Sequence, residues 1–186
     1  SSSSFQPFSL NPPHSFSLKG STPEKITFLP TALILLDNAY GVPVPFRVIL
    51  DIGSNANVIT EEAARKLGFS PRDSNMQISM VGGGVLRNIK EFVTTIRSRN
   101  PNYASFTKSI TCLIVPTLHS PLPYRNINWK NFESLPTCFL ADPRFHRANK
   151  IDMIIGSDIT LRSFLSDSQN LSNGAFVKET KFGWIV

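Results

Sequence analysis

The acidic turn that follows one apolar run constrains this chain more than any other feature. Phe46–Leu50 is mainly apolar, and Asp51-Ile52-Gly53-Ser54 follows it directly. An ionised carboxylate at the end of a buried strand is unfavourable unless hydrogen bonds or a partner share its charge. The pattern therefore indicates either an ordinary Asp-x-Gly turn or a strand end that holds a reactive acid.

Two pairs of extended segments are each separated by turn residues. Residues 26–36 and 42–50 are rich in aliphatic and β-branched side chains, with turn chemistry at 38–41. Residues 76–80 and 85–96 flank Val81-Gly82-Gly83-Gly84. We therefore expect two β-hairpins, of which the second is longer and has a glycine tip.

Capping signals predict two short helices. Thr60 is a suitable N-cap, two glutamates follow it at the positive end of the helix, and Gly68 would end the helix. Ser157 can cap a second helix that runs to about Leu165. Further strands are expected at residues 106–115, 151–155, 176–177 and 182–186. The expected fold is mostly β with two short helices.

The ends and one internal segment differ from this pattern. Residues 1–25 begin with four serines and contain four prolines, which is typical of a flexible linker, and the folded domain is expected over 26–186. Residues 116–150 contain five prolines and predict a loop-rich insert with a helical turn near 129–135. No apolar run of about 18 residues or secretory signal is present, so we expect a cytoplasmic protein without a membrane partner.

The charged, cysteine and histidine residues do not indicate a nucleic-acid or metal site. The net charge is +6, but the nearest approach to a basic cluster, Arg87, Lys90, Arg97 and Arg99, alternates with apolar residues as on the outer face of strands. Nucleic acid is therefore not expected as the main partner. The chain has two cysteines without metal-ligand spacing, expected to be unpaired thiols, and three scattered histidines, so neither a metal nor a cofactor is predicted. These residues are Cys112, Cys138, His14, His119 and His146.

Two further elements are ordinary when each is taken alone. Ile154-Ile155-Gly156-Ser157-Asp158 has the pattern of a strand-to-helix junction, and a glycine-tipped hairpin is a common turn. Their order is more specific: acid turn, short helix, glycine-tipped hairpin, apolar pair with glycine, short helix.

This order resembles that of retroviral-type aspartic proteases, and the chain from about Leu29 to Val186 is similar to the protease of Bel/Pao-type LTR retrotransposons, a retropepsin-like family. The resemblance implies a retropepsin-like acid protease β-barrel with a flap hairpin. Six blocks carry it in order: Leu29-Pro30-Thr31-Ala32, Ile49-Leu50-Asp51-Ile52-Gly53-Ser54-Asn55, Ile78-Ser79-Met80-Val81-Gly82-Gly83, Leu140-Ala141-Asp142-Pro143, Ile151-Asp152-Met153-Ile154-Ile155-Gly156-Ser157-Asp158 and Thr180-Lys181-Phe182-Gly183-Trp184-Ile185.

The resemblance also implies roles for individual residues. Asp51 would be the catalytic acid, supported in its turn by Ile52, Gly53, Ser54 and Gly156. The flap that closes over substrate would comprise Val81, Gly82, Gly83 and Gly84. Asp142 and Asp152 belong to matching blocks, but no chemistry requires them at the centre, so we interpret them as structural.

A second copy of the chain is needed to complete the site that this resemblance implies. Asp51 is the only aspartate with a glycine two residues later, so a second catalytic carboxylate would come from another subunit of a homodimer. The expected substrate is a peptide of the retrotransposon polyprotein, cleaved in the cytoplasm or within retrotransposon particles.

Ile52 is a departure from the resemblance. The family has Ser or Thr at this position, where the hydroxyl hydrogen-bonds across the dimer beneath the acids, and Ile52 cannot form that bond. The effect of this missing hydrogen bond on dimer stability ranges from nearly neutral to a loss of about 1–3 kcal/mol for each buried partner left unsatisfied. The alternative function is therefore a weakly active or inactive dimerisation or peptide-binding module, and a nucleic-acid-binding fragment is the remaining hypothesis.

Overall fold

The computed structural model describes residues 28–79, 84–118, 121–132, 135 and 138–186. The linker predicted at residues 1–25 lies outside this part of the chain, as do Val81, Gly82 and Gly83 of the flap tip. Those two predictions therefore stay predictions.

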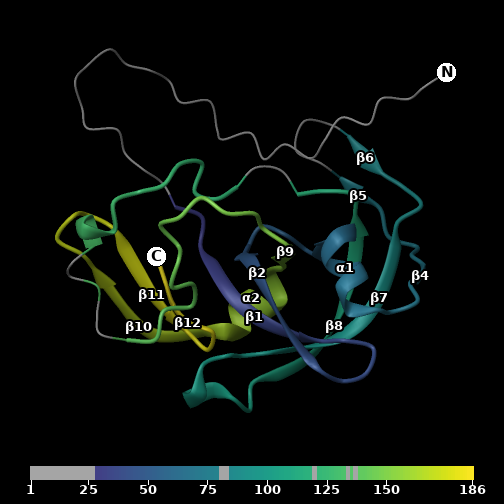
Figure 1. Cartoon of the computed structure of the whole chain (residues 1–186), viewed down its shortest axis with the longest axis horizontal. Helices are drawn as coiled ribbons and strands as arrows, with labels where there is room; N and C mark the ends of the chain where they lie inside the picture. The colour runs from purple at the N-terminus through teal and green to yellow at the C-terminus, as the bar shows by residue number, and fades with distance from the viewer. Residues whose placement is uncertain (1–27, 80–83, 119–120, 133–134, 136–137) are drawn as a thin grey trace.

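Six strands within the described residues close into a barrel (Figure 1). Strand β1 pairs with both β2 and β7, which closes the ring. The pairs β2–β9 and β3–β8 are parallel, and the other neighbours are antiparallel. The described chain also has two short α-helices, so the predicted mostly β barrel with two short helices is confirmed. In ring order the strands are β1 (Thr31–Asp37), β2 (Pro43–Leu50), β9 (Met153–Ile155), β3 (Asn57–Thr60), β8 (Thr107–Val115) and β7 (Lys90–Arg97), and β4 (Arg72–Asp73) extends the sheet beyond β7.

The first predicted hairpin is confirmed as β1 and β2, which pair antiparallel along the whole of β1. At its turn, the side-chain Oδ1 of Asn38 accepts hydrogen bonds from the backbone N–H groups of Tyr40 and Val42, both at 2.9 Å. Asparagine side chains satisfy turn backbone in this way, which explains why the chain reverses here.

Helix α1 (Glu61–Leu67) has the predicted caps. The Thr60 side chain accepts a hydrogen bond from the backbone N–H of Ala63, and Gly68 ends the helix in the left-handed conformation with φ of 70°. Glycine adopts this conformation without a steric penalty. Ala63 and Leu67 are buried, so the helix packs on the barrel through one face.

Helix α2 (Ser157–Ser163) differs from its prediction at both ends. Ser157 is the first helical residue, and the N-cap position is held by Gly156, which forms no side-chain cap. The prediction that Ser157 caps this helix is therefore wrong. The helix also ends before Leu165, because Phe164 begins the next strand, β10.

The second predicted hairpin is shorter than expected. Strand β5 (Ile78–Ser79) pairs with β6 (Val85–Leu86). The single strand expected over 85–96 is wrong, since β6 ends at Leu86 and β7 begins at Lys90. Asn88 between them has a positive φ of 56°, a conformation that asparagine tolerates better than most residues. This bend lets β7 join the barrel while β5 and β6 form a separate arm at the right of Figure 1.

The C-terminal segment forms a separate three-stranded sheet at the left of Figure 1. Its first strand was missed by the sequence analysis, because Ser166–Asn170 is polar and exposed and has no strand-like alternation. The other two strands confirm the predicted C-terminal strands. The strands are β10 (Phe164–Asn170), β11 (Phe176–Thr180) and β12 (Gly183–Ile185).

The insert at 116–150 packs against this sheet. The expected helical turn is present as a 3-10 helix at Trp129–Phe132, and a shorter 3-10 helix lies at Pro101–Tyr103. Aromatic rings of Phe28, Phe132 and Phe145 contact one another edge to face. This aromatic group belongs to a cluster that also contains Ile127, Leu171 and Val177. The insert and the C-terminal sheet therefore share a second apolar core.

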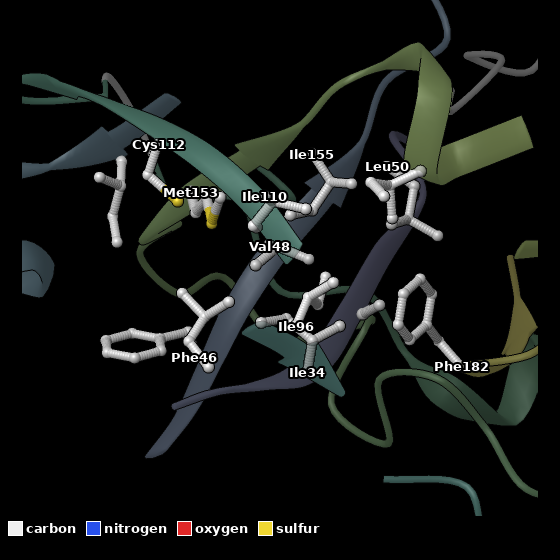
Figure 2. Close-up of a cluster of buried hydrophobic side chains, with 14 of the residues drawn as sticks. Ile34, Phe46, Val48, Leu50, Ile96, Ile110, Cys112, Met153, Ile155 and Phe182 are labelled. Carbon is white, nitrogen blue, oxygen red and sulfur yellow. The ribbon is translucent and has the colours of Figure 1, made fainter. Parts of the chain in front are cut away.

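The main core fills the barrel (Figure 2). Side chains from β1, β2, β7, β8 and β9 meet at its centre, and Phe182 reaches it from the C-terminal sheet. Burial of this apolar surface is the main force that holds the barrel closed. The labelled residues are Ile34, Phe46, Val48, Leu50, Ile96, Ile110, Cys112, Met153, Ile155 and Phe182.

Candidate active site

Asp51 lies at the end of β2 and is held by its neighbours through the backbone. Its N–H donates to the carbonyl of Ile155 at 2.9 Å, which continues the parallel pairing of β2 with β9. One carboxylate oxygen, Oδ1, accepts a hydrogen bond from the N–H of Gly53 at 2.8 Å. The side chain is half-buried. The turn therefore presents the carboxylate at the barrel surface in an orientation that its own backbone fixes.

Gly156 packs directly against this acid turn. A Cβ at Gly156 would lie 2.8 Å from the carbonyl oxygen of Ala56 and 3.0 Å from that of Ser54, so no side chain fits there. The next residue, Ser157, donates its N–H to the carbonyl of Ser54 at 2.7 Å. The structure thus brings together two sequence blocks about 100 residues apart, and the supporting role of Gly156 stays a prediction.

Ile52 and Ser54 differ in exposure and contacts. The Ser54 hydroxyl donates to the carbonyl of Ala56 at 2.8 Å, which tightens the loop after the acid. The Ile52 side chain is 62% exposed. An exposed aliphatic side chain beside an acid is suited to contact another molecule, although a single exposed apolar residue is common on protein surfaces.

An apolar cluster lies next to the acid turn. Ile49, Val58 and Ile154 come from the three adjoining strands β2, β3 and β9. Ile78 and Leu86 of the β5–β6 arm pack against this cluster. The arm therefore covers an apolar surface next to the acid turn. This surface includes Ile49, two residues before Asp51. Gly84 is half-buried at the described end of the predicted flap tip.

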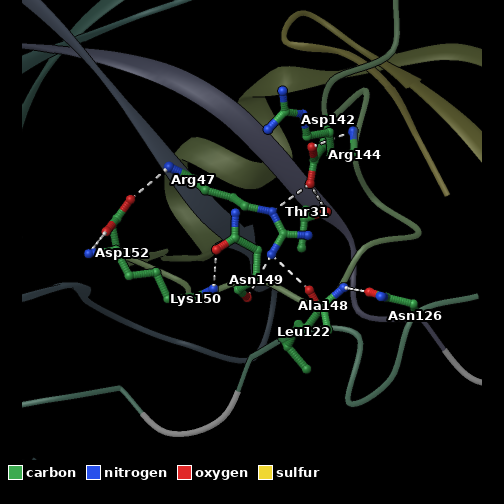
Figure 3. A network of polar contacts seen from close by, with 10 residues as sticks. All are labelled: Thr31, Arg47, Leu122, Asn126, Asp142, Arg144, Ala148, Asn149, Lys150 and Asp152. Carbon is green, nitrogen blue, oxygen red and sulfur yellow. Dashed lines mark hydrogen bonds and ion pairs between the residues drawn. The ribbon is translucent and has the colours of Figure 1, made fainter.

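Asp142 lies in a buried polar network with Arg47 and Thr31 (Figure 3). Its Oδ2 accepts hydrogen bonds from Arg47 Nε and from the Thr31 hydroxyl, both at 2.7 Å. The Arg47 guanidinium also donates to the backbone carbonyls of Leu122 and Asn149, at 2.8 and 2.9 Å. The network joins β1 and β2 to the insert.

Asp152 lies in the same network through the backbone of Arg47, whose N–H donates to Asp152 Oδ2 at 3.1 Å. Lys150 is 3.9 Å from the other oxygen of Asp152 and 2.6 Å from Glu62 of α1. Both acids thus bind structural partners, in agreement with the structural interpretation of Asp142 and Asp152.

Sequence reasoning missed two residues of this region. Arg47 interrupts the apolar run before Asp51, and a charged residue within a buried strand is a usable signal for an internal ion pair. Asn57 accepts a hydrogen bond from the N–H of Gly156 at 2.9 Å, and nothing in its local sequence indicates this contact.

The described residues give no sign of a metal centre, since no group of three or more His, Cys, Asp or Glu side chains among them is arranged to hold an ion. Both cysteines are free thiols, as expected, with Cys112 buried and Cys138 partly exposed. No helix in the described part of the chain is long and apolar enough to cross a membrane.

Comparison with solved structures finds the EIAV protease in complex with the inhibitor HBY-793. The match has 17% sequence identity and a TM-score of 0.40, and covers 76% of this chain and 93% of the EIAV protease chain. No protein-family model and no curated protein matches the chain.

Proposed function

We propose that this protein is an aspartic endopeptidase of the retropepsin-like type, from the polyprotein of a Bel/Pao-type LTR retrotransposon, and that it acts as a homodimer with one Asp51 from each subunit. One observation carries the proposal: the half-buried carboxylate of Asp51 is fixed between two strand ends, next to an apolar cluster that a hairpin arm covers. That arrangement holds an acid where an extended peptide can reach it.

The proposed chemistry uses the two acids as a coupled pair. Two carboxylates brought together across a two-fold axis share one proton, because like charges at short distance disfavour ionisation of both. The ionised acid takes a proton from a water molecule that attacks the scissile carbonyl carbon. The protonated acid hydrogen-bonds the carbonyl oxygen and then helps the amine leave. The reaction needs no cofactor or covalent intermediate in this scheme.

The homodimer in this proposal follows from the single acid turn. One chain carries one Asp-x-Gly element, so a pair requires a second copy. Ile52, beside the acid and 62% exposed, would lie at or near the contact between the copies. Its burial on dimerisation would favour association, since apolar surface leaves water.

The proposed substrate is an extended peptide with apolar side chains. The peptide would lie between the acid pair and the two arms, as an added strand held by backbone hydrogen bonds. Ile78 and Leu86 of the arm would then close over substrate side chains instead of the apolar cluster that they cover in the free chain. Val81, Gly82, Gly83 and Gly84 would form the tip of this flap.

The second candidate function is an inactive dimerisation or peptide-binding module, favoured by Ile52 at a position where the family has a hydroxyl. Nucleic-acid binding has less support. Of the four basic residues between Arg87 and Arg99, two form ion pairs. Lys90 pairs with Asp73 at 2.8 Å, and Arg97 pairs with Asp37 at 2.7 Å.

The test is cleavage of a library of apolar peptides between about pH 4 and 7, the range that suits a shared-proton carboxylate pair. Wild type is compared with Asp51→Asn at several protein concentrations. Activity that rises faster than linearly with concentration and is absent from Asp51→Asn supports the dimeric protease. A folded wild type without activity at any concentration leaves the binding module as the better account. Affinity for nucleic acid that falls steeply with salt would instead favour the nucleic-acid-binding fragment.

A further inference from the structure

We infer that Asn57 is a positioning residue for the carboxylate of Asp51, acting through the backbone of Gly156. The inference rests on the proposed protease function, and it adds a residue that the acid turn itself does not contain. Asn57 is the first residue of β3, six positions after Asp51.

The side chain of Asn57 connects three strands. Its Oδ1 accepts a hydrogen bond from the N–H of Gly156, just after β9, at 2.9 Å. Its Nδ2 donates to the carbonyl of Thr111 on β8 at 3.3 Å. Because the amide has a donor on one side and an acceptor on the other, one side chain satisfies both backbone groups.

Gly156 depends on this acceptor for two reasons. Gly156 is buried, and a buried N–H that lacks a hydrogen-bond partner destabilises the folded state. Gly156 is also the N-cap residue of α2, and the third helical residue, Ile159, has no side-chain acceptor that could reach back to this N–H as a capping-box Glu or Gln would. The hydrogen bond must therefore come from another element, and Asn57 supplies it.

The segment that Asn57 holds is the one that fixes Asp51. The carbonyl of Ile155 accepts a hydrogen bond from the N–H of Asp51 at 2.9 Å. The N–H of Ser157 donates to the carbonyl of Ser54 at 2.7 Å. Gly156 lies between these two contacts. A shift of Gly156 is therefore transmitted to both ends of the acid turn.

The chemistry is sensitive to such a shift. Two carboxylates on different chains share a proton only when their oxygens lie within hydrogen-bond distance of each other. A displacement of about 1 Å can cost about 100-fold in rate. Loss of the Asn57 amide should therefore act on turnover more than on substrate binding.

The experiment compares Asn57→Ala with a matched control, Asn126→Ala. Asn126 also accepts a backbone N–H through Oδ1, from Ala148 at 2.8 Å, but it lies in the insert. We expect kcat to fall about 10- to 100-fold in Asn57→Ala with KM changed less than about twofold. Asn126→Ala should retain wild-type kcat. Equal kcat in the two variants would overturn the inference.

A second variant, Asn57→Asp, distinguishes positioning from a merely structural role. It keeps an oxygen acceptor for the Gly156 N–H but loses the Nδ2 donor to the Thr111 carbonyl, so it should recover part of the kcat that Asn57→Ala loses. It also adds a negative charge six residues after Asp51, which disfavours a second charge on the acid pair and so should move the pH profile of kcat to higher pH. An unchanged pH profile together with no recovery of kcat would contradict the inference. The pH profile of Asn57→Asp can be compared with wild type even if Asn57→Ala does not fold.

One measurement needs no turnover and separates this inference from the proposed function. The Gly156 amide should exchange its hydrogen faster in Asn57→Ala, while core amides keep their protection. If wild type shows no cleavage, the protease proposal fails and this exchange still tests the contact. Unchanged protection of the Gly156 amide would show that Asn57 does not hold it, whatever the activity.

Discussion

The Nε of Arg47 on β2 donates to Oδ2 of Asp142 in the insert across 2.7 Å, and the two side chains are only 7% and 1% exposed. The pair joins residues 95 positions apart. Since Arg47 lies on β2, which ends one residue before Asp51, the insert is attached to the strand that leads into the acid turn.

Replacing one partner of this pair should destabilise the protein strongly. In Asp142→Asn the guanidinium of Arg47 stays buried without a counter-charge, so we expect the free energy of unfolding to fall by about 3–5 kcal/mol. Denaturant unfolding measures this. The control is Asp158→Asn, which removes an exposed pair with Arg162 on α2 and should leave stability nearly unchanged. Similar losses in the two variants would contradict the structural role of the buried pair.

A methyl group at Gly156 should disturb the acid turn. In Gly156→Ala the new carbon would meet the Ala56 carbonyl at 2.8 Å, so the two segments must separate. We expect a loss of about 1–3 kcal/mol in unfolding free energy and a large loss of cleavage. Gly41→Ala is the comparison, since it meets no atom within 4 Å and is strained only by its φ of +76°. It should cost about 1–2 kcal/mol and keep full activity.

Local signals in the sequence predicted the parts of the fold that short-range chemistry decides. Thr60 and Gly68 bound α1 as expected, because a hydroxyl cap and a left-handed glycine act within one turn of helix. The first hairpin was predictable for the same reason, since Asn38 satisfies its own turn. The mostly β class followed from many such short strands, whereas the barrel was implied by the resemblance to retropepsin-like proteases.

The remaining features depend on contacts between distant segments. Residues 85–96 read as one extended run, but β7 must pair with β8 and β1 to close the barrel, and the chain bends at Asn88. Ser157 looked like a helix cap, whereas close packing on Ala56 assigns the cap position to Gly156. For the candidate site, the acid turn could be found in the sequence. The contact between Asn57 and Gly156 could not, because it spans 99 residues.

The two thiols should differ in reactivity. Burial raises the pKa of Cys112 to about 12, so at pH 8 its thiol is protonated, and only the thiolate reacts readily. Burial, with a smaller contribution from Glu179, also raises the pKa of Cys138, but that side chain is partly exposed. A thiol reagent should therefore modify Cys138 slowly in the native protein and Cys112 only after unfolding. Rapid native labelling of Cys112, measured with Cys138→Ser, would contradict the buried placement.

Stability should depend on the protonation of His146. Burial and then the neighbouring Arg147 lower the pKa of His146 below its ordinary value of 6.5, and its Nδ1 is buried without a hydrogen-bond partner among the described residues. The folded state thus binds the proton less well than the unfolded state, so this contribution to stability is complete above about pH 6.5 and is lost as pH falls through the folded pKa. His146→Gln should reduce the difference in unfolding free energy between pH 5 and pH 7. An unchanged difference would show that the ring is not desolvated.

The exposed side chain of Ile52 allows the two proposed functions to be separated. In the proposed dimer a hydroxyl at this position would hydrogen-bond between the subunits, so Ile52→Thr should add that bond. Ile52→Val is the matched control, because valine has nearly the shape of threonine and lacks the hydroxyl. Since Ile52 is 62% exposed in the single chain, both variants should keep monomer stability within about 0.5 kcal/mol of wild type.

The two variants should differ from each other both in dimer affinity and in activity. A new hydrogen bond contributes about 0.5–1.5 kcal/mol net, which corresponds to a dimer that is about two- to tenfold tighter in Ile52→Thr than in Ile52→Val. Sedimentation equilibrium measures that dissociation constant, and peptide cleavage at low protein concentration should rise in the same order. A tighter Ile52→Thr dimer without any cleavage would favour the binding module. If threonine and valine behave identically in both measurements, Ile52 does not lie at the subunit contact, and the proposed dimer must be arranged differently.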